Sequence, residues 1–112
     1  MSLDLTPIAE FMAGTQRSAW LSIGPYQVYV RKAFHLINGN VEITLDLANV
    51  QRDGDVYAGF WQIFSELCKT GKAAGIPYLF LENTHNARLH AAYVSRGCIP
   101  IPGPDRSLYK IL

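Results

Sequence analysis

The stretch that decides the fold reads Ala74-Gly75-Ile76-Pro77-Tyr78-Leu79-Phe80-Leu81-Glu82-Asn83. Gly75 and Pro77 together predict the end of a helix, because glycine accepts the left-handed conformation that follows a helix and proline cannot continue one. The apolar run at 78–81 shows no alternation, which is typical of a central strand covered on both faces. We therefore place this strand inside a sheet, directly after a helix.

Helical spacing marks the segments on both sides of this strand. The preceding segment carries a stripe of apolar residues, namely Phe60, Ile63, Phe64, Leu67 and Cys68. The following segment begins between 83 and 86, has an inner stripe of Leu89, Ala92 and Tyr93, and ends at Gly97. Spacings of three and four place each stripe on one face of a helix.

The earlier part of the chain changes to a period of two, which predicts three antiparallel strands at 20–23, 26–37 and 40–48. Asn38-Gly39 predicts a tight type I′ turn between the second and third strands. On the third strand we expect one face to be buried and the other to meet solvent. The residues expected to be buried are Val41, Ile43, Leu45 and Leu47, and those expected to meet solvent are Glu42, Thr44, Asp46 and Ala48.

Two short segments complete the prediction at the ends of the chain. Thr6-Pro7 predicts a helix with Thr6 as its N-cap and Pro7 at its first position. Residues 98–112 predict a final hairpin, whose first strand should lie at an edge because Pro100 cannot donate a hydrogen bond.

A strand, a helix and a second strand in this order predict that 40–48 and 77–82 lie side by side and parallel. The fold class is therefore α/β (α+β), with a mixed, mostly antiparallel sheet and a central parallel pair. The length of 112 residues gives room for one core, so we expect a single domain spanning 1–112.

Composition narrows the function classes. The net charge is +1 and the basic residues are dispersed, whereas nucleic-acid binding requires a basic stripe. No apolar run approaches the ~20 residues of a membrane span, and the N-terminus lacks a signal-peptide pattern, so we expect a cytoplasmic protein without membrane contact. Cys68 and Cys98 predict reduced thiols, and we predict no metal site.

Asn86-x-x-Leu89-x-x-x-Tyr93-x-x-x-Gly97, preceded by Gly75-Ile76-Pro77, resembles the GNAT superfamily of acyl-CoA-dependent N-acetyltransferases. The resemblance covers 19–112, and the N-terminal part is abbreviated relative to that family. The chain is also similar in shape to the small acetyltransferase-like proteins of tailed phages.

The resemblance implies that acetyl-CoA, as co-substrate, lies where the strands at 40–48 and 77–82 separate. It implies that backbone groups of Leu47 and Ala48 pair with the pantetheine arm, with Asn83 and Asn86 contacting the same arm. It also implies that Tyr93 donates a proton to the departing thiolate, which is chemically reasonable because a tyrosine stays protonated near pH 7.

An amine acceptor also needs a base, and three carboxylates are candidates. Asp46 is the first choice because it is nearest the expected gap, and Glu42 and Glu82 are the alternatives. Each of these side chains also has a structural interpretation: Asp46 as a solvated carboxylate, Asn86 as a helix cap, and Tyr93 as part of a core stripe.

The family binds the CoA pyrophosphate at a glycine-rich loop before its first long helix. Gln51, Arg52 and Gly54 match that loop, but Val56 replaces its last small residue. Asp53 and Asp55 flank the glycine, and a carboxylate ~4 Å from a phosphate is repelled by roughly 4 kcal/mol at an effective dielectric of 20.

Two functions therefore stay open. The first is an N-acetyltransferase that uses acetyl-CoA and an unidentified amine acceptor. The second is a catalytically silent GNAT-like protein, of phage type, that binds a host or virion protein. A module binding another small ligand is a third option, and the hairpin at 98–112 offers a route to a homodimer.

Overall fold

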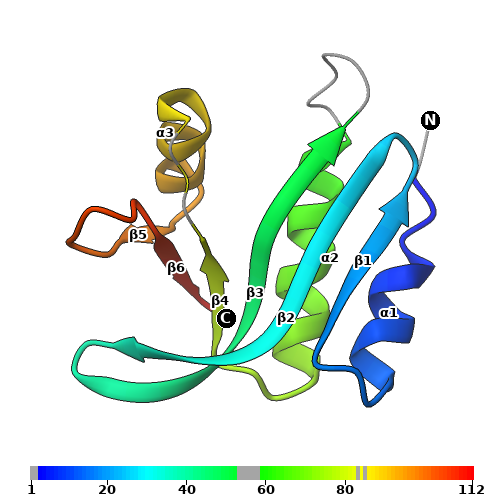
Figure 1. Ribbon diagram of the computed structural model, residues 1–112, viewed down its shortest axis with the longest axis horizontal. Coiled ribbons are helices and arrows are strands. Elements are labelled where there is room, and N and C mark those ends of the chain that lie inside the picture. Colours follow the sequence, from blue (N-terminus) through cyan, green and yellow to red (C-terminus); the bar gives the residue numbers. More distant parts are fainter. Residues whose placement is uncertain (1–2, 53–58, 83, 85) are drawn as a thin grey trace.

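The computed structural model describes residues 3–52, 59–82, 84 and 86–112, except for the side chain of Arg52. Its elements, in chain order (Figure 1), are α1 (Thr6–Ala13), β1 (Ser18–Ile23), β2 (Tyr26–Ile37), β3 (Asn40–Arg52), α2 (Phe60–Ala73), β4 (Tyr78–Leu81), α3 (Ala87–Ser95), β5 (Ile99–Pro100) and β6 (Leu108–Ile111). In these parts of the chain, no helix is long and apolar enough to cross a membrane.

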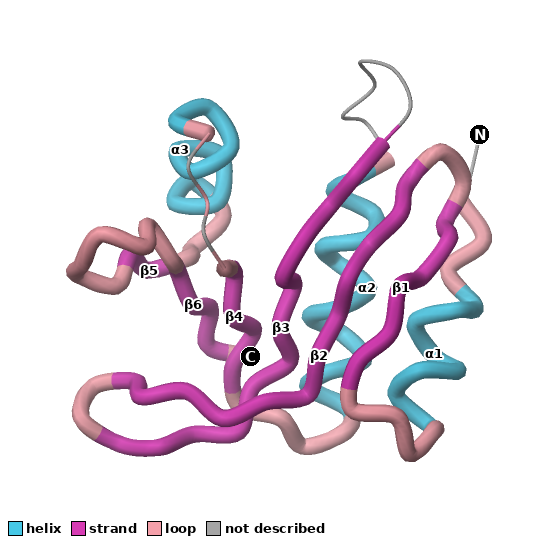
Figure 2. The backbone as a smooth tube through the Cα atoms, viewed as in Figure 1, coloured by secondary structure: helices cyan, strands magenta, loops and turns pink. Residues whose placement is uncertain are grey.

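One six-stranded sheet has the order β1-β2-β3-β4-β6-β5. Among the described strands only β3 and β4 run parallel, and every other neighbouring pair is antiparallel. The helices α1 and α2 lie on one side of the β1–β2–β3 region, while α3 stands beyond the end of β4 (Figure 2). This confirms the predicted fold class, the central parallel pair and the edge position of β5.

The main core lies between the sheet and the helices α1 and α2. The apolar stripe predicted for α2 forms its helical side, because Phe60, Ile63, Phe64 and Leu67 are all buried. β4 is buried along most of its length, as the run at 78–81 predicted. The helical spacing predicted for α2 and the burial predicted for the strand at 78–81 are thus both confirmed.

Turn chemistry places the boundaries where local residues predicted them. Asn38 and Gly39 both have positive φ, at 52° and 83°, as a type I′ turn requires. Gly75 follows α2 with φ 79°. The prediction for Thr6 was wrong: Leu5 is the N-cap of α1, and Asp4 Oδ1 instead accepts a hydrogen bond from the Thr6 amide at 3.0 Å.

The hairpin between β2 and β3 extends past the rest of the sheet. β1 pairs with β2 as far as Arg31, and β4 pairs with β3 from Thr44 onward. Residues 33–43, which we call the arm, pair across the hairpin and bend over the sheet face opposite α2. Ile37 packs there against Phe80 and Tyr109.

Because the arm bends, the predicted buried and exposed faces of β3 are wrong for several residues near the arm. Val41 and Ile43 are 73% and 41% exposed, because α1 and α2 do not cover this part of the hairpin. Thr44 and Asp46, expected in solvent, are fully buried, because the arm covers the face on which they lie. Leu45 and Leu47 are buried as predicted.

A β-bulge interrupts the pairing of β2 with β3. Val30 faces Leu47 and Tyr29 faces Asn49, which leaves Ala48 as an additional residue on β3. The pairing of β3 with β4 ends at the same place, with Leu47 opposite Leu81. A bulge bends its strand and increases its twist, so β3 turns away from β4 beyond this point.

Candidate functional site

A cavity lies where β3 and β4 separate. Its volume is about 400 Å³, and it begins beside the last backbone hydrogen bond between the two strands, from the Glu82 amide to the Leu47 carbonyl at 3.3 Å. The cavity is lined by Leu47, Ala48, Asn49, Val50, Leu81, Glu82, Thr84, Asn86, Leu89 and Tyr93. The resemblance implied a gap at this position, and four of the predicted site residues, Leu47, Ala48, Asn86 and Tyr93, line the cavity.

Tyr93 borders the cavity from α3 while its side chain is only 2% exposed. Its ring packs against Phe60, Trp61 and Phe64 of α2, with centroids 5.7–6.1 Å apart. Burial raises the pKa of the Tyr93 hydroxyl well above its ordinary value, and the nearby Cys98 adds to the shift. The hydroxyl therefore remains protonated across the physiological range.

Asn86 both borders the cavity and caps α3. Its Oδ1 accepts a hydrogen bond from the Leu89 amide at 3.0 Å, which satisfies one of the free N–H groups at the start of the helix. The amide nitrogen of the same side chain is not used by this cap. Capping is thus compatible with a second contact to a bound ligand.

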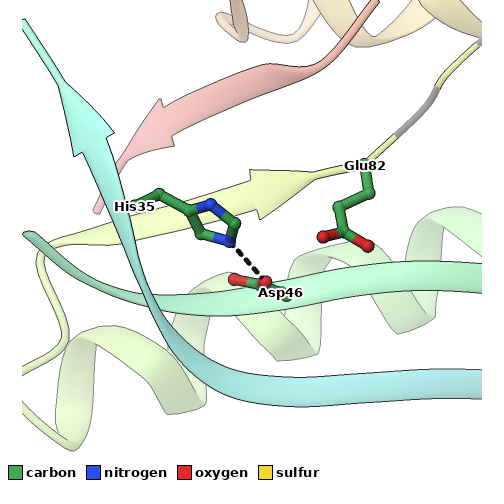
Figure 3. Close-up of side chains that lie close together, drawn as sticks. All are labelled: His35, Asp46 and Glu82. Carbon is green, nitrogen blue, oxygen red and sulfur yellow. Dashed lines mark hydrogen bonds and ion pairs between the residues drawn. The ribbon is translucent and has the colours of Figure 1, made fainter. Parts of the chain in front are cut away.

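Asp46 lies at the centre of a polar cluster beneath the arm (Figure 3). His35 Nε2 is 2.7 Å from Asp46 Oδ2, and Thr44 Oγ1 donates a hydrogen bond to Asp46 Oδ1 at 2.5 Å. Arg31 Nη2 donates to Asp46 Oδ2 at 3.3 Å and also pairs with Glu82. The prediction that Asp46 is a solvated carboxylate was wrong, since it is fully buried and bonded to three side chains.

The position of His35 is fixed by stacking as well as by this hydrogen bond. Its ring lies parallel to that of Phe80, with centroids 3.6 Å apart and an angle of 5° between the planes. The arm supplies His35, and β4 supplies Phe80. The cluster therefore depends on the bend of the arm over the sheet.

His35, Asp46 and Glu82 also form the group of potential metal ligands found in the described part of the chain, with ligand atoms within 4.8 Å of one another. Arg31 pairs with both carboxylates, so a guanidinium already supplies the positive charge at this position. Burial works to lower the pKa of Arg31, but Glu82 and Asp46 outweigh it and the pKa is raised. The guanidinium of Arg31 remains charged. Arg31, Asp46 and Glu82 therefore form an ion-pair network.

The other predicted site residues divide by position. Leu47 and Ala48 line the cavity at the bulge. Gln51 is exposed near the end of β3, and Arg52 is its last residue. Gly54 and Asn83 lie outside the described residues, so the predicted phosphate loop is described only at its first two positions.

Sequence reasoning missed Arg31 and His35 as members of the site. Both are odd-numbered residues of β2, and alternate residues of a strand point to the same face. Their position on one face could therefore have been recognised from the sequence. Their meeting with Asp46 follows from the antiparallel register, in which Arg31 lies directly opposite Asp46. Glu82 was considered only as an alternative base, and its ion pair with Arg31 was not predicted.

Comparisons with known proteins give a likeness to a solved structure. No protein-family model and no curated protein matches the chain. Among solved structures, a tyrosine-to-phenylalanine mutant of the toxin AtaT, bound to the C-terminus of the antitoxin AtaR and to acetyl-CoA, matches with a TM-score of 0.58 and 18% sequence identity. The match covers 77% of this chain and 57% of the toxin, so the chain spans little more than half the toxin's length. At this identity the likeness shows the fold alone, and it confirms the GNAT-like α+β architecture predicted from the sequence.

Proposed function

We propose that the chain is an acyl-CoA-dependent N-acetyltransferase that moves the acetyl group of acetyl-CoA to an amine acceptor. The observation that carries the proposal is the cavity of about 400 Å³ at the separation of two parallel strands, with both Tyr93 and Glu82 in its lining. The likeness to a toxin structure that contains acetyl-CoA supports the same ligand.

The edge of β3 suits a pantetheine arm. Beyond Leu47 this strand no longer pairs with β4, so the backbone of residues 48–50 faces the cavity instead of a neighbouring strand. Pantetheine contains two amide groups, which can extend the sheet as an added strand does. Leu89 and Val50 supply apolar contacts for its methylene groups, and the amide nitrogen of Asn86, which the helix cap does not use, supplies a donor.

Tyr93 acts on the leaving thiolate in this proposal. A free thiol has a pKa of ~8.5, far below that of the buried tyrosine, so complete transfer of the phenolic proton to the thiolate is unfavourable. The hydroxyl is instead a hydrogen-bond donor that stabilises the negative charge on sulfur as the C–S bond breaks. The sequence assigned Tyr93 the role of a proton donor, and we propose the role of a hydrogen-bond donor.

Calorimetry with acetyl-CoA tests the proposal directly. We expect saturable heat with acetyl-CoA and a rise in melting temperature. Tyr93→Phe should reduce kcat by ~10²-fold with nearly unchanged acetyl-CoA affinity, because it removes a donor used mainly in the transition state. The matched control is Tyr29→Phe, which changes a tyrosine that packs against Trp20 and does not line the cavity. No heat and no thermal shift at millimolar acetyl-CoA would contradict the proposal.

A catalytically silent protein that binds a host or virion protein is the second candidate. The observation that favours it is the exposed apolar surface on the arm, which includes Phe34 and Leu36 at 66% and 65% exposure. Contiguous apolar surface of this kind is commoner at interaction sites than elsewhere. The same calorimetry separates the two candidates, since the silent protein has no requirement for acetyl-CoA.

A further inference from the structure

We propose that a second cavity, between the arm and the segment 101–107, binds the amine acceptor, and that His35 accepts its proton. This inference rests on the proposed acetyl transfer and adds the acceptor site to it. The cavity, which we call the arm cleft, lies on the sheet face opposite α2. Its walls are His35 and Leu36 of the arm, Phe80 of β4, and residues of the segment 101–107.

The size and lining of the arm cleft define a class of acceptor. Its volume is about 180 Å³, and a water molecule in the liquid occupies ~30 Å³, so there is space for roughly six heavy atoms. Phe80, Pro102 and Pro104 line it with apolar surface, while His35 and Asp105 bring polar groups. A primary amine on a short aliphatic stem fits both features.

Charge favours a cationic acceptor. Asp46 and Glu82 carry two negative charges in the cluster, and Arg31 supplies one positive charge, which leaves an excess of one negative charge beside the cleft. Asp105 adds a further carboxylate to the lining. An ammonium group is therefore attracted to the cleft, and a carboxylate or phosphate is repelled.

The polar cluster lies between the arm cleft and the acetyl-CoA cavity. His35 lines the cleft, Glu82 lines the larger cavity, and ligand atoms of these residues and Asp46 lie within 4.8 Å of one another. The two cavities have no lining residue in common, so the proposal requires the amine to reach the thioester past His35 and Glu82. The short distance between these two side chains is what a direct transfer between two bound substrates requires.

His35 is the member of the cluster that can take the proton. Its Nε2 lies 2.7 Å from Asp46 Oδ2 and donates to it, which leaves the lone pair of Nδ1 as the acceptor. Asp46 is fully buried and has no access to an acceptor, so it is a positioning residue that holds the ring and its tautomer. The ring of Phe80 stacks parallel to the ring of His35 and fixes its plane.

Each bond and proton in the proposed transfer has a defined destination. His35 Nδ1 first takes a proton from the bound ammonium group and passes it to water. The neutral amine nitrogen then forms a bond to the thioester carbonyl carbon while one of its remaining protons moves to His35 Nδ1. The C–S bond then breaks, and its electron pair stays on sulfur as the CoA thiolate, which Tyr93 stabilises by donating a hydrogen bond. The acetamide leaves through the cleft, and His35 returns its proton to water.

Binding is tested first by NMR of protein labelled at histidine and backbone nitrogens, with n-butylamine as the probe. We expect saturable shifts of His35 and of amides in 101–107 with n-butylamine, and much smaller shifts with 1-butanol, which has the same stem without the charge. His90 on α3 is an internal control. Equal shifts with both compounds, or none with either, would overturn the inference even where acetyl-CoA binds.

Catalysis is tested with His35→Gln, which keeps a donor near Asp46 but cannot accept a proton at neutral pH. Thiol release from acetyl-CoA with n-butylamine should fall at least ~10²-fold, with acetyl-CoA affinity unchanged by calorimetry. Undiminished turnover in a variant that still binds acetyl-CoA would refute the role of His35 and leave the proposed function standing. If wild-type protein binds acetyl-CoA without using n-butylamine, the NMR titration alone decides.

Asp46→Asn tests positioning separately from folding. The neutral amide in this variant would no longer favour the ring tautomer with the proton on Nε2, so the ¹⁵N shifts of His35 should change together with the loss of rate. A rate loss with unchanged ¹⁵N shifts would contradict the positioning role. His35→Gln alone carries the test of proton transfer if the Asp46 variant does not fold.

Discussion

Single buried groups determine how this fold responds to alkaline pH. Burial raises the pKa of the Cys98 thiol from 9.0 to about 11, with nearby charged groups making smaller contributions. The pKa of the Tyr93 hydroxyl is shifted in the same direction from 10.0, again mainly by burial. Both groups are neutral when protonated, so the folded state retains protons that the unfolded state releases.

Stability should therefore fall as pH rises from about 9 to 11, the interval between the ordinary and the folded pKa of Cys98. The free energy of unfolding is unaffected by this group below pH 9, and the loss should reach roughly 2 kcal/mol near pH 11, since one pKa unit corresponds to ~1.4 kcal/mol. Urea titrations at several pH values measure it.

Cys98→Ala is the control for this prediction. The variant should show a smaller decline between pH 9 and 10, where Cys68, whose pKa burial also raises from 9.0, still contributes, and it should retain the part above pH 10 that Tyr93 contributes. An identical decline between pH 9 and 10 in the variant and the wild type would exclude Cys98 as its source.

At the same scale, sequence reasoning found several cavity residues and misjudged the environment of Asp46. Tyr93 and Asn86 were predicted from a resemblance to the GNAT motif whose matching residues lie close together in the chain. The burial of Asp46 depends on Arg31 and His35 from another strand and on the bend of the arm. Alternation along β3 contains no information about what covers its second face.

At the scale of elements, α3 is a nine-residue helix whose start depends on Asn86. Asn86→Ala should lower the free energy of unfolding by ~1 kcal/mol, because the Leu89 amide loses its partner. Asn86→Asp should keep the cap and most of the stability. Chemical denaturation compares the three proteins.

The same pair of variants separates capping from ligand binding. If Asn86 also donates to pantetheine, Asn86→Asp should bind acetyl-CoA more weakly despite its intact cap, because a carboxylate has no donor. Equal acetyl-CoA affinity in Asn86→Asp and wild type would restrict Asn86 to its structural role.

Element boundaries were predictable where backbone conformation depends on local chemistry. Asn38-Gly39 and Gly75 were placed correctly because positive φ selects asparagine and glycine. β3 runs to Arg52 instead of ending at 48, because its pairing with β2 continues through the bulge. Thr6 was misplaced because Asp4 provides a competing oxygen two residues earlier.

At the scale of the whole molecule, the arm has one face on the sheet and one in solvent. The solvent face carries two cross-strand pairs, Phe34 with Ile43 and Leu36 with Val41. The sequence predicted part of this face as core, because apolar alternation is the same whether or not a helix covers it. Only the lengths and directions of distant elements decide that question.

Replacing Phe34 and Val41 together by threonine should change the free energy of unfolding by less than ~1 kcal/mol, because exposed positions are tolerant. The double variant should also elute earlier from a hydrophobic-interaction column. Leu45→Thr, on the same strand but fully buried, is the matched control and should cost ~2–4 kcal/mol. A large loss of stability in the double variant would contradict the prediction, because it would mean that the solvent face of the arm is packed against other residues.

The extra residue at Ala48 also changes the numbering phase of β3. Inward-facing apolar positions are odd before it, at Leu45 and Leu47, and even after it, at Val50, which packs against the main core. A shift from odd to even within a single run of apolar residues thus records where this strand leaves its neighbour. The place where β3 separates from β4 can therefore be recognised from the spacing of three aliphatic residues, Leu45, Leu47 and Val50, without reference to any polar residue.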